Sequence, residues 1–377
     1  MTDWHGLFRA RFDATPRLYW APGRVNLIGD HIDYCGGTVL PMPIQYGTFV
    51  AVRLTDTDTV RAVSTNLPEP IELRGGIGAA LPRGSWGRFV EGAIAVLARE
   101  GVSITGADIL VGGDIPGSGL SSSASLTVGL IYALANGTLA PLQLALAAQR
   151  VEHEFVGVQC GLMDQAVIAL APRGAALLFD CSRHRHRAIA VNDASVRFVV
   201  VDTGCVRQLV DSAYNARLNE TKAAAATLDV AHHALATVDL AVFEARRTRI
   251  LDPVVQRRAR HVVTESARVA RAASALETGD WPALGRALSE SHASLRDDYE
   301  VSCPELDVLA EALQSQPGCY GARMTGAGFG GSVVALIEAA KIESVLNASA
   351  SQYERRFGRA PSAFVAESHG GVRSVDG

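Results

Sequence analysis

Three short stretches of this 377-residue chain gather side chains that could do chemistry. Residues 24–34, RVNLIGDHIDY, carry an arginine, a histidine and two aspartates beside a strand-like run. Residues 112–124, GGDIPGSGLSSSA, form a glycine-rich turn followed by a serine-rich helix start. Residues 157–165, GVQCGLMDQ, place Asp164 at the start of an otherwise apolar helix. An aspartate in that position is also a common helix cap, so a structural explanation stands beside the chemical one.

The glycine–serine stretch favours an anionic ligand. Its glycines let backbone N–H groups close around an anion, and the N-terminus of the following helix adds unsatisfied donors and a partial positive charge. Its serine hydroxyls can cap the helix or bind phosphate and metal. A tight turn with a helix cap explains the same residues, so this stretch alone does not decide the function.

The basic residues exclude several mechanisms. Only Lys222 and Lys341 are lysines among 35 basic residues, and neither follows a glycine-rich loop. The chain therefore lacks the lysine of a P-loop and the strand lysine of protein kinases. With 35 basic against 39 acidic residues, the net charge is −4, which provides no field to hold nucleic acid or an anionic membrane. We expect small-molecule chemistry, with neither nucleic acid nor a membrane as a partner.

Cysteine spacing and hydropathy indicate the compartment. The six cysteines form no C-x-x-C pair and no spacing typical of a disulfide framework or a zinc site. The first 19 residues mix charges with apolar residues, unlike a secretory signal, and no run of 18 apolar residues occurs. We expect a cytoplasmic protein in a reducing environment.

The hydrophobic pattern predicts the elements that must position these residues. Strands are expected within 17–60, at 107–111 and within 321–337, and the chain should close with a helix and a strand. Helices are expected at 86–100, 121–136, 141–155, after 164, and at 213–233, 252–278 and 281–297. This mixed order predicts α+β domains in place of a doubly wound sheet. A polar, basic stretch near 181–192 marks the expected boundary between a domain at 1–190 and one at 191–377.

Six segments resemble one enzyme family in the family's order, from about residue 17 to 335. APGRVNLIGDHIDY, which begins at Ala21, resembles the signature of galactokinases. PGSGLSSSA resembles the phosphate loop of the wider GHMP kinases, which include homoserine, mevalonate and phosphomevalonate kinases. The other segments are GVQCGLMDQ, SAYNAR, SHASLRDDYEVSCPELD and MTGAGFGG. The resemblance implies the two-domain GHMP kinase fold, with a ribosomal S5 domain 2-like N-terminal domain, a ferredoxin-like C-terminal domain and the active site between them.

The implied reaction is ATP-dependent phosphorylation of the anomeric hydroxyl of D-galactose, giving galactose 1-phosphate and ADP. By the resemblance, Asp164 accepts the proton of the sugar hydroxyl and Arg24 lies beside it. An aspartate with a pKa of about 3.9 is a weak base for such a hydroxyl. A loose transition state needs little nucleophilic help, so Asp164 can orient the hydroxyl and take its proton late. Arg24 would stabilise charge on the transferring phosphoryl group.

The resemblance also assigns binding residues. Those for the sugar are Asp30, His31, Asp33, the Gly161 backbone and Tyr214. Those for ATP are Gly117, Ser118, Gly119, Leu120, Ser121, Ser122 and Ser123, with Ser64 and Trp86 near the adenosine. Ser123 and Glu152 would hold Mg²⁺ through hard oxygen atoms. Arg323 and the loop Thr325–Gly331 are expected to close over the site.

One position departs from the family pattern, and it leaves alternatives open. Galactokinases typically carry glutamate where this chain has Asp30, whose carboxylate is roughly 1.5 Å shorter in reach. A GHMP kinase for galacturonic acid, arabinose or N-acetylgalactosamine is therefore an alternative. A non-catalytic galactose sensor is another, although such proteins tend to lose the serine stretch or the catalytic pair, both of which are present here. We expect a monomer that binds ATP and a hexose.

Overall fold

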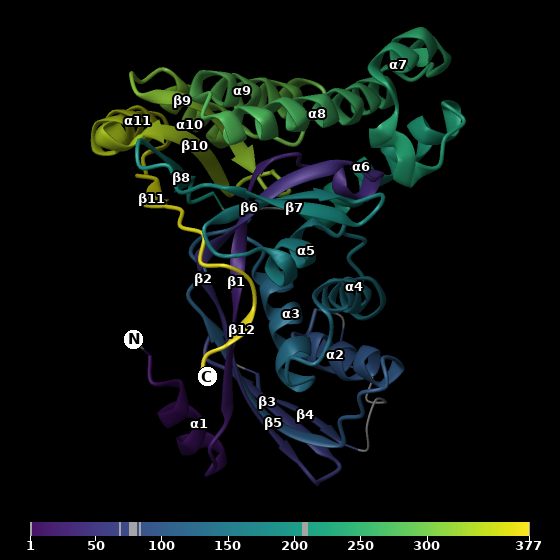
Figure 1. Ribbon diagram of the computed structural model, residues 1–377, viewed down its shortest axis with the longest axis vertical. Helices are drawn as coiled ribbons and strands as arrows, with labels where there is room; N and C mark the ends of the chain where they lie inside the picture. The colour runs from purple at the N-terminus through teal and green to yellow at the C-terminus, as the bar shows by residue number, and fades with distance from the viewer. Residues whose placement is uncertain (1, 68, 75–80, 83, 206–209, 377) are drawn as a thin grey trace.

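Two separate sheets organise the chain, one in the lower and one in the upper part of Figure 1. The structure is a computed structural model that describes residues 2–67, 69–74, 81–82, 84–205 and 210–376. All strand pairs are antiparallel except β3 with β5. Both sheets are accompanied by helices, so the predicted α+β class is confirmed.

The first sheet has the order β12-β1-β2-β5-β3-β4, and β6 joins it through β2 and also pairs with β7. Its strands are β1 (Arg17–Ile28), β2 (Thr38–Thr55), β3 (Thr59–Ser64), β4 (Ile71–Arg74), β5 (Gly106–Gly113), β6 (Ala175–Asp180), β7 (Arg185–Ala190) and β12 (Arg373–Ser374). After its first residue β1 is buried throughout, because both of its faces are covered. This explains why its sequence shows a nearly continuous apolar run without alternation.

Four helices lie together on one side of the long strands β1 and β2: α2 (Gly87–Arg99), α3 (Ser122–Leu134), α4 (Pro141–Val151) and α5 (Met163–Leu170) (Figure 1). A π-helical turn at Glu152–Val156 continues α4. The short helix α1 (Trp4–Phe12) packs Trp4 and Phe8 against Leu18, Ala51 and Leu110 in a separate cluster.

The second sheet has the order β11-β8-β10-β9 and forms the core of the C-terminal half. Its strands are β8 (Val196–Asp202), β9 (Cys319–Thr325), β10 (Ser332–Glu338) and β11 (Ser362–Val365). Its helices are α6 (Val210–Thr227), α7 (Leu240–Arg246), α8 (Pro253–Thr278), α9 (Trp281–Asp297), α10 (Pro304–Gln314) and α11 (Ile342–Phe357). Short 3₁₀ turns occur at Asp33–Cys35, His232–Thr237, Arg247–Arg249 and Ala339–Lys341. Within the described ranges, no helix combines the length and the apolar character needed to cross a bilayer.

The long helix α8 shows how local sequence sets an element's ends. The Asp252 side chain accepts hydrogen bonds from two backbone N–H groups of the first turn, and Pro253 occupies the first helical position, where no N–H is needed. Gly279 ends the helix with a φ of 72°, a left-handed conformation that glycine adopts without strain. The predicted span 252–278 is therefore confirmed.

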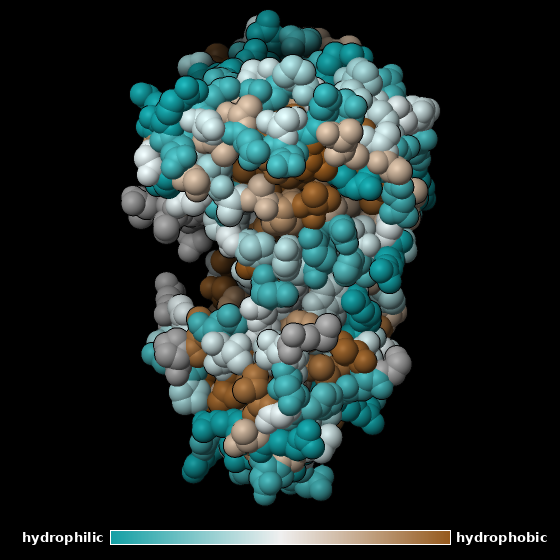
Figure 2. All heavy atoms as spheres, turned by 90° about the vertical axis from the view of Figure 1, so that its left-hand side faces the viewer, coloured by the Kyte–Doolittle hydropathy of each residue, from teal (hydrophilic) through white to brown (hydrophobic). Residues whose placement is uncertain are grey.

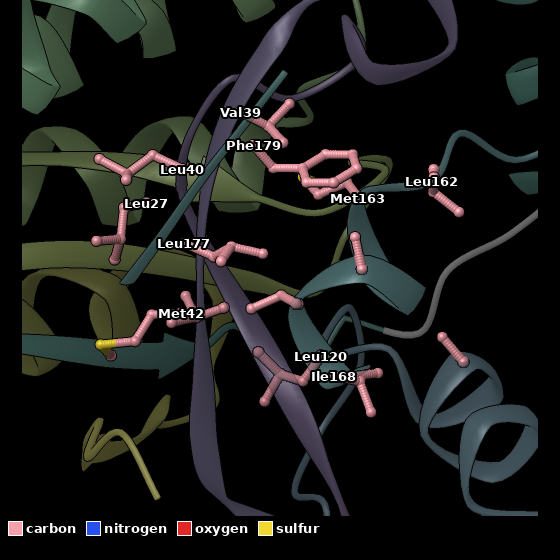
Figure 3. Packing of buried hydrophobic residues seen from close by; sticks show 14 of the residues in the cluster. Leu27, Val39, Leu40, Met42, Leu120, Leu162, Met163, Ile168, Leu177 and Phe179 are labelled. Atoms are coloured by element: carbon pink, nitrogen blue, oxygen red, sulfur yellow. The ribbon is translucent and has the colours of Figure 1, made fainter. Parts of the chain in front are cut away.

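Leucine and methionine side chains from strands and helices pack together in the core (Figure 3). Leu27 of β1, Leu40 and Met42 of β2 and Leu177 of β6 are all essentially inaccessible to solvent. Leu120 of the loop before α3 and Ile168 of α5 reach the same cluster (Figure 3). Because this packing fixes β1 and α5 against each other, it also fixes the polar residues that these elements carry.

Two predicted helices end earlier than expected. The helix predicted at 213–233 ends at Thr227, because Asp229 is left-handed with a φ of 60°. Val230 N–H donates to Ala225 O and Asp229 N–H donates to Ala226 O, which is a Schellman ending. The helix predicted at 141–155 becomes the π-helical turn after Val151.

The chain changes sheet between β7 and β8, close to the expected boundary at residue 190. The expected second domain, residues 191–377, nevertheless contributes β12 to the first sheet, where Tyr19 pairs with Ser374. The C-terminal segment thus returns along the first half of the chain (Figure 1). The pairing of β12 with β1 therefore joins the two halves of the chain, in addition to the covalent connection between β7 and β8.

Candidate active site

A cavity of about 300 Å³ brings together residues from both halves of the chain. Figure 2 shows a face of the molecule whose outline is indented between an upper and a lower lobe. Most of the predicted site residues line the cavity: Arg24, Asp30, His31, Asp33, Gly119, Ser121, Ser122, Ser123, Glu152, Gly161, Asp164 and Tyr214. Stretches far apart in the sequence therefore form one site.

An ion pair between Arg24 and Asp164 lies at the centre of this set. Nε of Arg24 donates to Oδ1 of Asp164 at 2.7 Å and Nη2 donates to Oδ2 at 2.8 Å, which is a bidentate geometry. The pairing of β1 with β2 is irregular on both sides of Arg24, and such irregularities redirect side chains. Arg24 is buried, whereas the Asp164 side chain is 27% exposed and open to the cavity.

The same pair fixes the glycine–serine loop. Nη1 of Arg24 donates to Gly119 O at 2.7 Å, and the Arg24 N–H donates to Leu120 O at 3.0 Å. Ser121 precedes α3 in a left-handed conformation, with a φ of 61°, and its hydroxyl donates to Asp164 Oδ2. Strand β1, the loop and α5 are therefore locked to one another through polar contacts.

The loop is also held from the second sheet. Asp202, at the end of β8, accepts a hydrogen bond from Ser118 N–H at 3.1 Å. A Cβ atom at Gly117 would lie 1.8 Å from Asp202 Oδ2, so only glycine fits there, and its φ of 68° is left-handed. Ser122 and Ser123 are exposed at the start of α3, where hydroxyl and N–H donors can meet an anion.

Asp33 and Gly161 both line the cavity and lie in contact with each other. A Cβ atom at Gly161 would lie 2.0 Å from Asp33 Oδ2, so the glycine gives the carboxylate its place. Burial, and then the charge of Asp164, raise the pKa of Asp33 to about 7. Tyr214 of α6 lines the same part of the cavity, and its pKa is raised by burial and by the charge of Asp33.

The protonation of His31 follows from its partners. Burial lowers its pKa to about 3, so the ring is neutral at neutral pH. Nε2 lies 3.1 Å from Ala327 O, and because a carbonyl oxygen only accepts, Nε2 carries the proton. Nδ1 must then accept from the Tyr34 hydroxyl at 3.0 Å, and Tyr34 in turn accepts from Tyr299 at 2.7 Å. His31 thus connects the turn after β1 to the loop after β9 through its hydrogen bond with Ala327 O.

Asp30 is bound by protein groups on both of its oxygens. Arg323 Nη2 donates to Oδ2, and Gly326 N–H donates to Oδ1 at 3.1 Å. Arg323 is fully buried behind Asp30, so the expectation that it closes over the site is wrong, whereas Gly326 and Ala327 of the same loop do line the cavity. Burial raises the pKa of Asp30, and Arg323 opposes that shift. A direct contact of Asp30 with the sugar stays a prediction.

Glu152 has the surroundings of a metal ligand. The residue is 4% exposed, and one carboxylate oxygen accepts from Gln165 Nε2 at 3.0 Å. Burial, and then the charge of Asp164, raise the pKa of Glu152 to about 7. Ser123 presents a hydroxyl to the same cavity. Oxygen atoms of these kinds fit Mg²⁺, which keeps waters and phosphate oxygens among its ligands. In the part of the chain that the structure describes, no group of three His, Cys, Asp or Glu residues is placed to hold a metal.

Family models match this chain in three places. The galactokinase galactose-binding signature matches residues 6–54, the GHMP kinases N terminal domain matches 88–171, and the GHMP kinases C terminal model matches 272–355. The galactokinase of Roseiflexus sp. is 40% identical over 362 residues, which are 94% of this chain and 92% of that protein. This chain belongs to the galactokinases.

Solved structures agree with that assignment. Lactococcus lactis galactokinase complexed with galactose is similar with a TM-score of 0.94 and 35% identity, over 98% of each chain. The Methanococcus jannaschii mevalonate kinase is similar with a TM-score of 0.64 over 94% of this chain and 99% of that chain, and at 18% identity it shows the fold alone. The predicted two-domain GHMP kinase fold is confirmed.

Among the residues that the structure describes, five of those predicted to bind ATP do not line the cavity: Gly117, Ser118, Leu120, Ser64 and Trp86. Leu120 is a core residue (Figure 3). Trp86 is 7% exposed, and its Nε1 donates to Glu69 O at 2.8 Å. Ser64 accepts from the N–H groups of Asn66 and Leu67 at the end of β3. A role for Trp86 and Ser64 near the adenosine stays a prediction.

Sequence reasoning missed seven residues that line the cavity: Tyr34, Val156, Gly157, Val158, Cys160, Met163 and Asn215. Several adjoin predicted residues directly, as Tyr34 follows Asp33 and Asn215 follows Tyr214. Because a turn can place neighbouring side chains in one pocket, their position next to a predicted site residue could have indicated them. Gln165 does not line the cavity, but its amide donates to Glu152. The positions of these two residues in the sequence do not predict that hydrogen bond.

The raised pKa of Asp33 predicts a pH-dependent change in stability. Since about 7 lies above the ordinary value of 3.8, the folded state binds more protons than the unfolded state between these values, and stability is lost as pH rises through this window. Asp33→Asn, which cannot ionise, should therefore gain stability over the wild type as pH rises from about 4 to about 7, with no further gain above.

Thermal denaturation of the ligand-free proteins from pH 4 to pH 8 tests this. Asp56→Asn, the same substitution at an exposed aspartate, provides the control. A melting-temperature difference between Asp33→Asn and the wild type that stays constant with pH would contradict the assignment of the raised pKa to Asp33.

Proposed function

We propose that this enzyme transfers the γ-phosphoryl group of ATP to the anomeric hydroxyl of D-galactose. The observation that carries the proposal is the bidentate pair of Arg24 and Asp164, which lies where the phosphate loop meets the residues assigned to the sugar. Burial raises the pKa of both Asp33 and Glu152, and the charge of Asp164 raises both further, so Asp164 lies near both carboxylates. A group that takes part in transfer between two substrates must lie between their binding sites, as Asp164 would here.

The triphosphate would be bound without a lysine. Neither Lys222 nor Lys341 lines the cavity, so the donors available are the exposed hydroxyls of Ser122 and Ser123, backbone N–H groups at the start of α3, and the guanidinium of Arg24. The helix N-terminus adds a partial positive charge toward the phosphates. Ser123 and Glu152 would hold Mg²⁺, which neutralises charge on the phosphates when bound.

The sugar would be held at the opposite end. An ionised carboxylate can accept hydrogen bonds from two neighbouring hydroxyls, which suits Asp33 beside the Gly161 backbone. Tyr214 adds an aromatic face and a hydroxyl from α6. A polar site of this type rejects sugars that lack the matching hydroxyl, because its buried groups are then left without partners.

Asp164 would orient the anomeric hydroxyl and accept its proton. Both Asp164 oxygens already accept from Arg24, and the partly exposed face of the carboxylate remains open to the sugar hydroxyl. In a loose transition state the bond between the γ-phosphoryl group and ADP is largely broken before the sugar hydroxyl loses its proton, so a weak base suffices. Arg24 then balances the negative charge of the carboxylate and of the phosphoryl group in flight.

Replacing the proton acceptor tests the chemical role directly. Asp164→Asn keeps the shape of the side chain but cannot accept the proton, so galactose affinity should stay within a few fold while kcat falls by about 10³-fold or more. Steady-state kinetics together with equilibrium galactose binding measure the two quantities separately. Asp56→Asn on the surface serves as the control, and an Asp164→Asn enzyme with kcat within tenfold of the wild type would refute the role.

A panel of sugars tests the substrate. In a coupled assay of ADP release, D-galactose should give the highest kcat/KM, above galacturonic acid, arabinose and N-acetylgalactosamine. A higher value for one of the other sugars would move the assignment to that sugar. Saturable galactose binding with no ADP release from any sugar would indicate a sensor.

A further inference from the structure

The turn that begins the sugar side of the site has an unusual backbone. Gly29 has a φ of 102° and His31 a φ of 64°, and a non-glycine residue in the left-handed region is uncommon. The turn carries Asp30 and His31, both of which line the cavity, and leads to Asp33. Its shape therefore decides where these side chains point, and surrounding contacts must keep it.

Two side chains of α8 hold the backbone of this turn. Glu265 Oε1 accepts from Gly29 N–H at 3.1 Å, and His261 Nε2 lies 3.2 Å from Asp30 O. The two residues are four apart in the helix, so they lie on the same face. Both are fully buried and neither lines the cavity, so they act on the turn and not on a ligand directly.

The protonation of His261 makes the contact directional. The carbonyl oxygen of Asp30 only accepts, so Nε2 of His261 carries the proton and donates it. Nδ1 then accepts from the Ser294 hydroxyl at 2.9 Å, a shorter contact than the 3.3 Å between the same hydroxyl and Asp298 Oδ2. Burial lowers the pKa of His261 to about 4, which agrees with a neutral ring of this single tautomer.

The Glu265 carboxylate is ionised, and both of its oxygens accept hydrogen bonds. Burial alone would raise its pKa, but the charges of Arg268 and further basic groups outweigh burial and lower the pKa to about 2. Arg268 Nε donates to Oε2 at 2.6 Å, and the Ser291 hydroxyl donates to Oε1 at 2.5 Å. Three kinds of donor thus converge on one carboxylate, and Gly29 N–H is one of them.

We propose that His261 and Glu265 are positioning residues for sugar binding, which hold the turn at residues 29–31 in its binding shape. The inference rests on the proposed function, because it takes the sugar to lie against this turn. In the described part of the chain, the side-chain hydrogen bonds of His261 and Glu265 go to the turn, to α8 and to α9, and none goes to the phosphate loop. Loss of these contacts should weaken galactose binding and leave ATP binding alone.

His261→Leu removes the donor to Asp30 O, whereas His261→Gln keeps an N–H group at similar reach. The control is Val262→Ala, which opens a cavity at a fully buried neighbour that has no side-chain polar contact with the turn. KM for D-galactose, KM for ATP, kcat and the melting temperature are measured for each. We expect KM for galactose to rise at least tenfold in His261→Leu and to stay within threefold in His261→Gln, with KM for ATP within twofold in both.

A second variant serves if His261→Leu does not fold. Glu265→Gln keeps the volume, but its NH₂ group must face donors on Arg268 or Gly29, so KM for galactose should rise at least threefold with KM for ATP unchanged. Val262→Ala should lower the melting temperature while both KM values stay within twofold of the wild type.

Three results would overturn the inference. One is a folded His261→Leu, or a folded Glu265→Gln, with KM for galactose within twofold of the wild type. Another is a galactose effect of equal size in Val262→Ala, because the effect would then follow stability alone. A wild-type enzyme without galactose turnover would overturn the proposed function and this inference together, and the wild type is assayed in parallel to separate that case.

Discussion

The bidentate ion pair of Arg24 and Asp164 is the interaction on which the arrangement of the site depends. It joins β1 to α5, and through Gly119 O and the Ser121 hydroxyl it also fixes the loop before α3. Arg24 is buried, so removal of its partner would leave a charge with little solvent around it. One pair of side chains thus both positions the loop and balances the charge of the carboxylate, and we propose that the same pair acts in phosphoryl transfer.

The second half of the chain lines part of the cavity and also supports it from behind. Asp202 at the end of β8 holds Ser118, and Arg323 of β9 holds Asp30 from behind the cavity. The helix α8 holds the backbone of the turn that carries Asp30 and His31. Contacts between the two halves of the chain therefore fix both ends of the cavity.

Sequence patterns predicted the local elements well and the distant contacts poorly. The starts of α8 and α9 follow from aspartate caps and early prolines, and the end of α8 follows from a terminal glycine. By contrast, α6 ends at Thr227 because Asp229 adopts a left-handed backbone that its residue type does not require. Arg24 and Asp164 are 140 residues apart, so only the resemblance to galactokinases placed them together. The contact of Arg323 with Asp30 spans 293 residues and depends on how β9 packs against β1, which periodicity does not contain.

The claim that Arg24 and Asp164 work as one unit is tested most directly by a double-mutant cycle. Residues that act together are not additive, so removal of the second partner should have little further effect once the first is lost. The account predicts that Arg24→Met combined with Asp164→Asn lowers kcat no more than about tenfold below the worse single variant. Losses in kcat that multiply across the two substitutions would show independent roles and contradict the account.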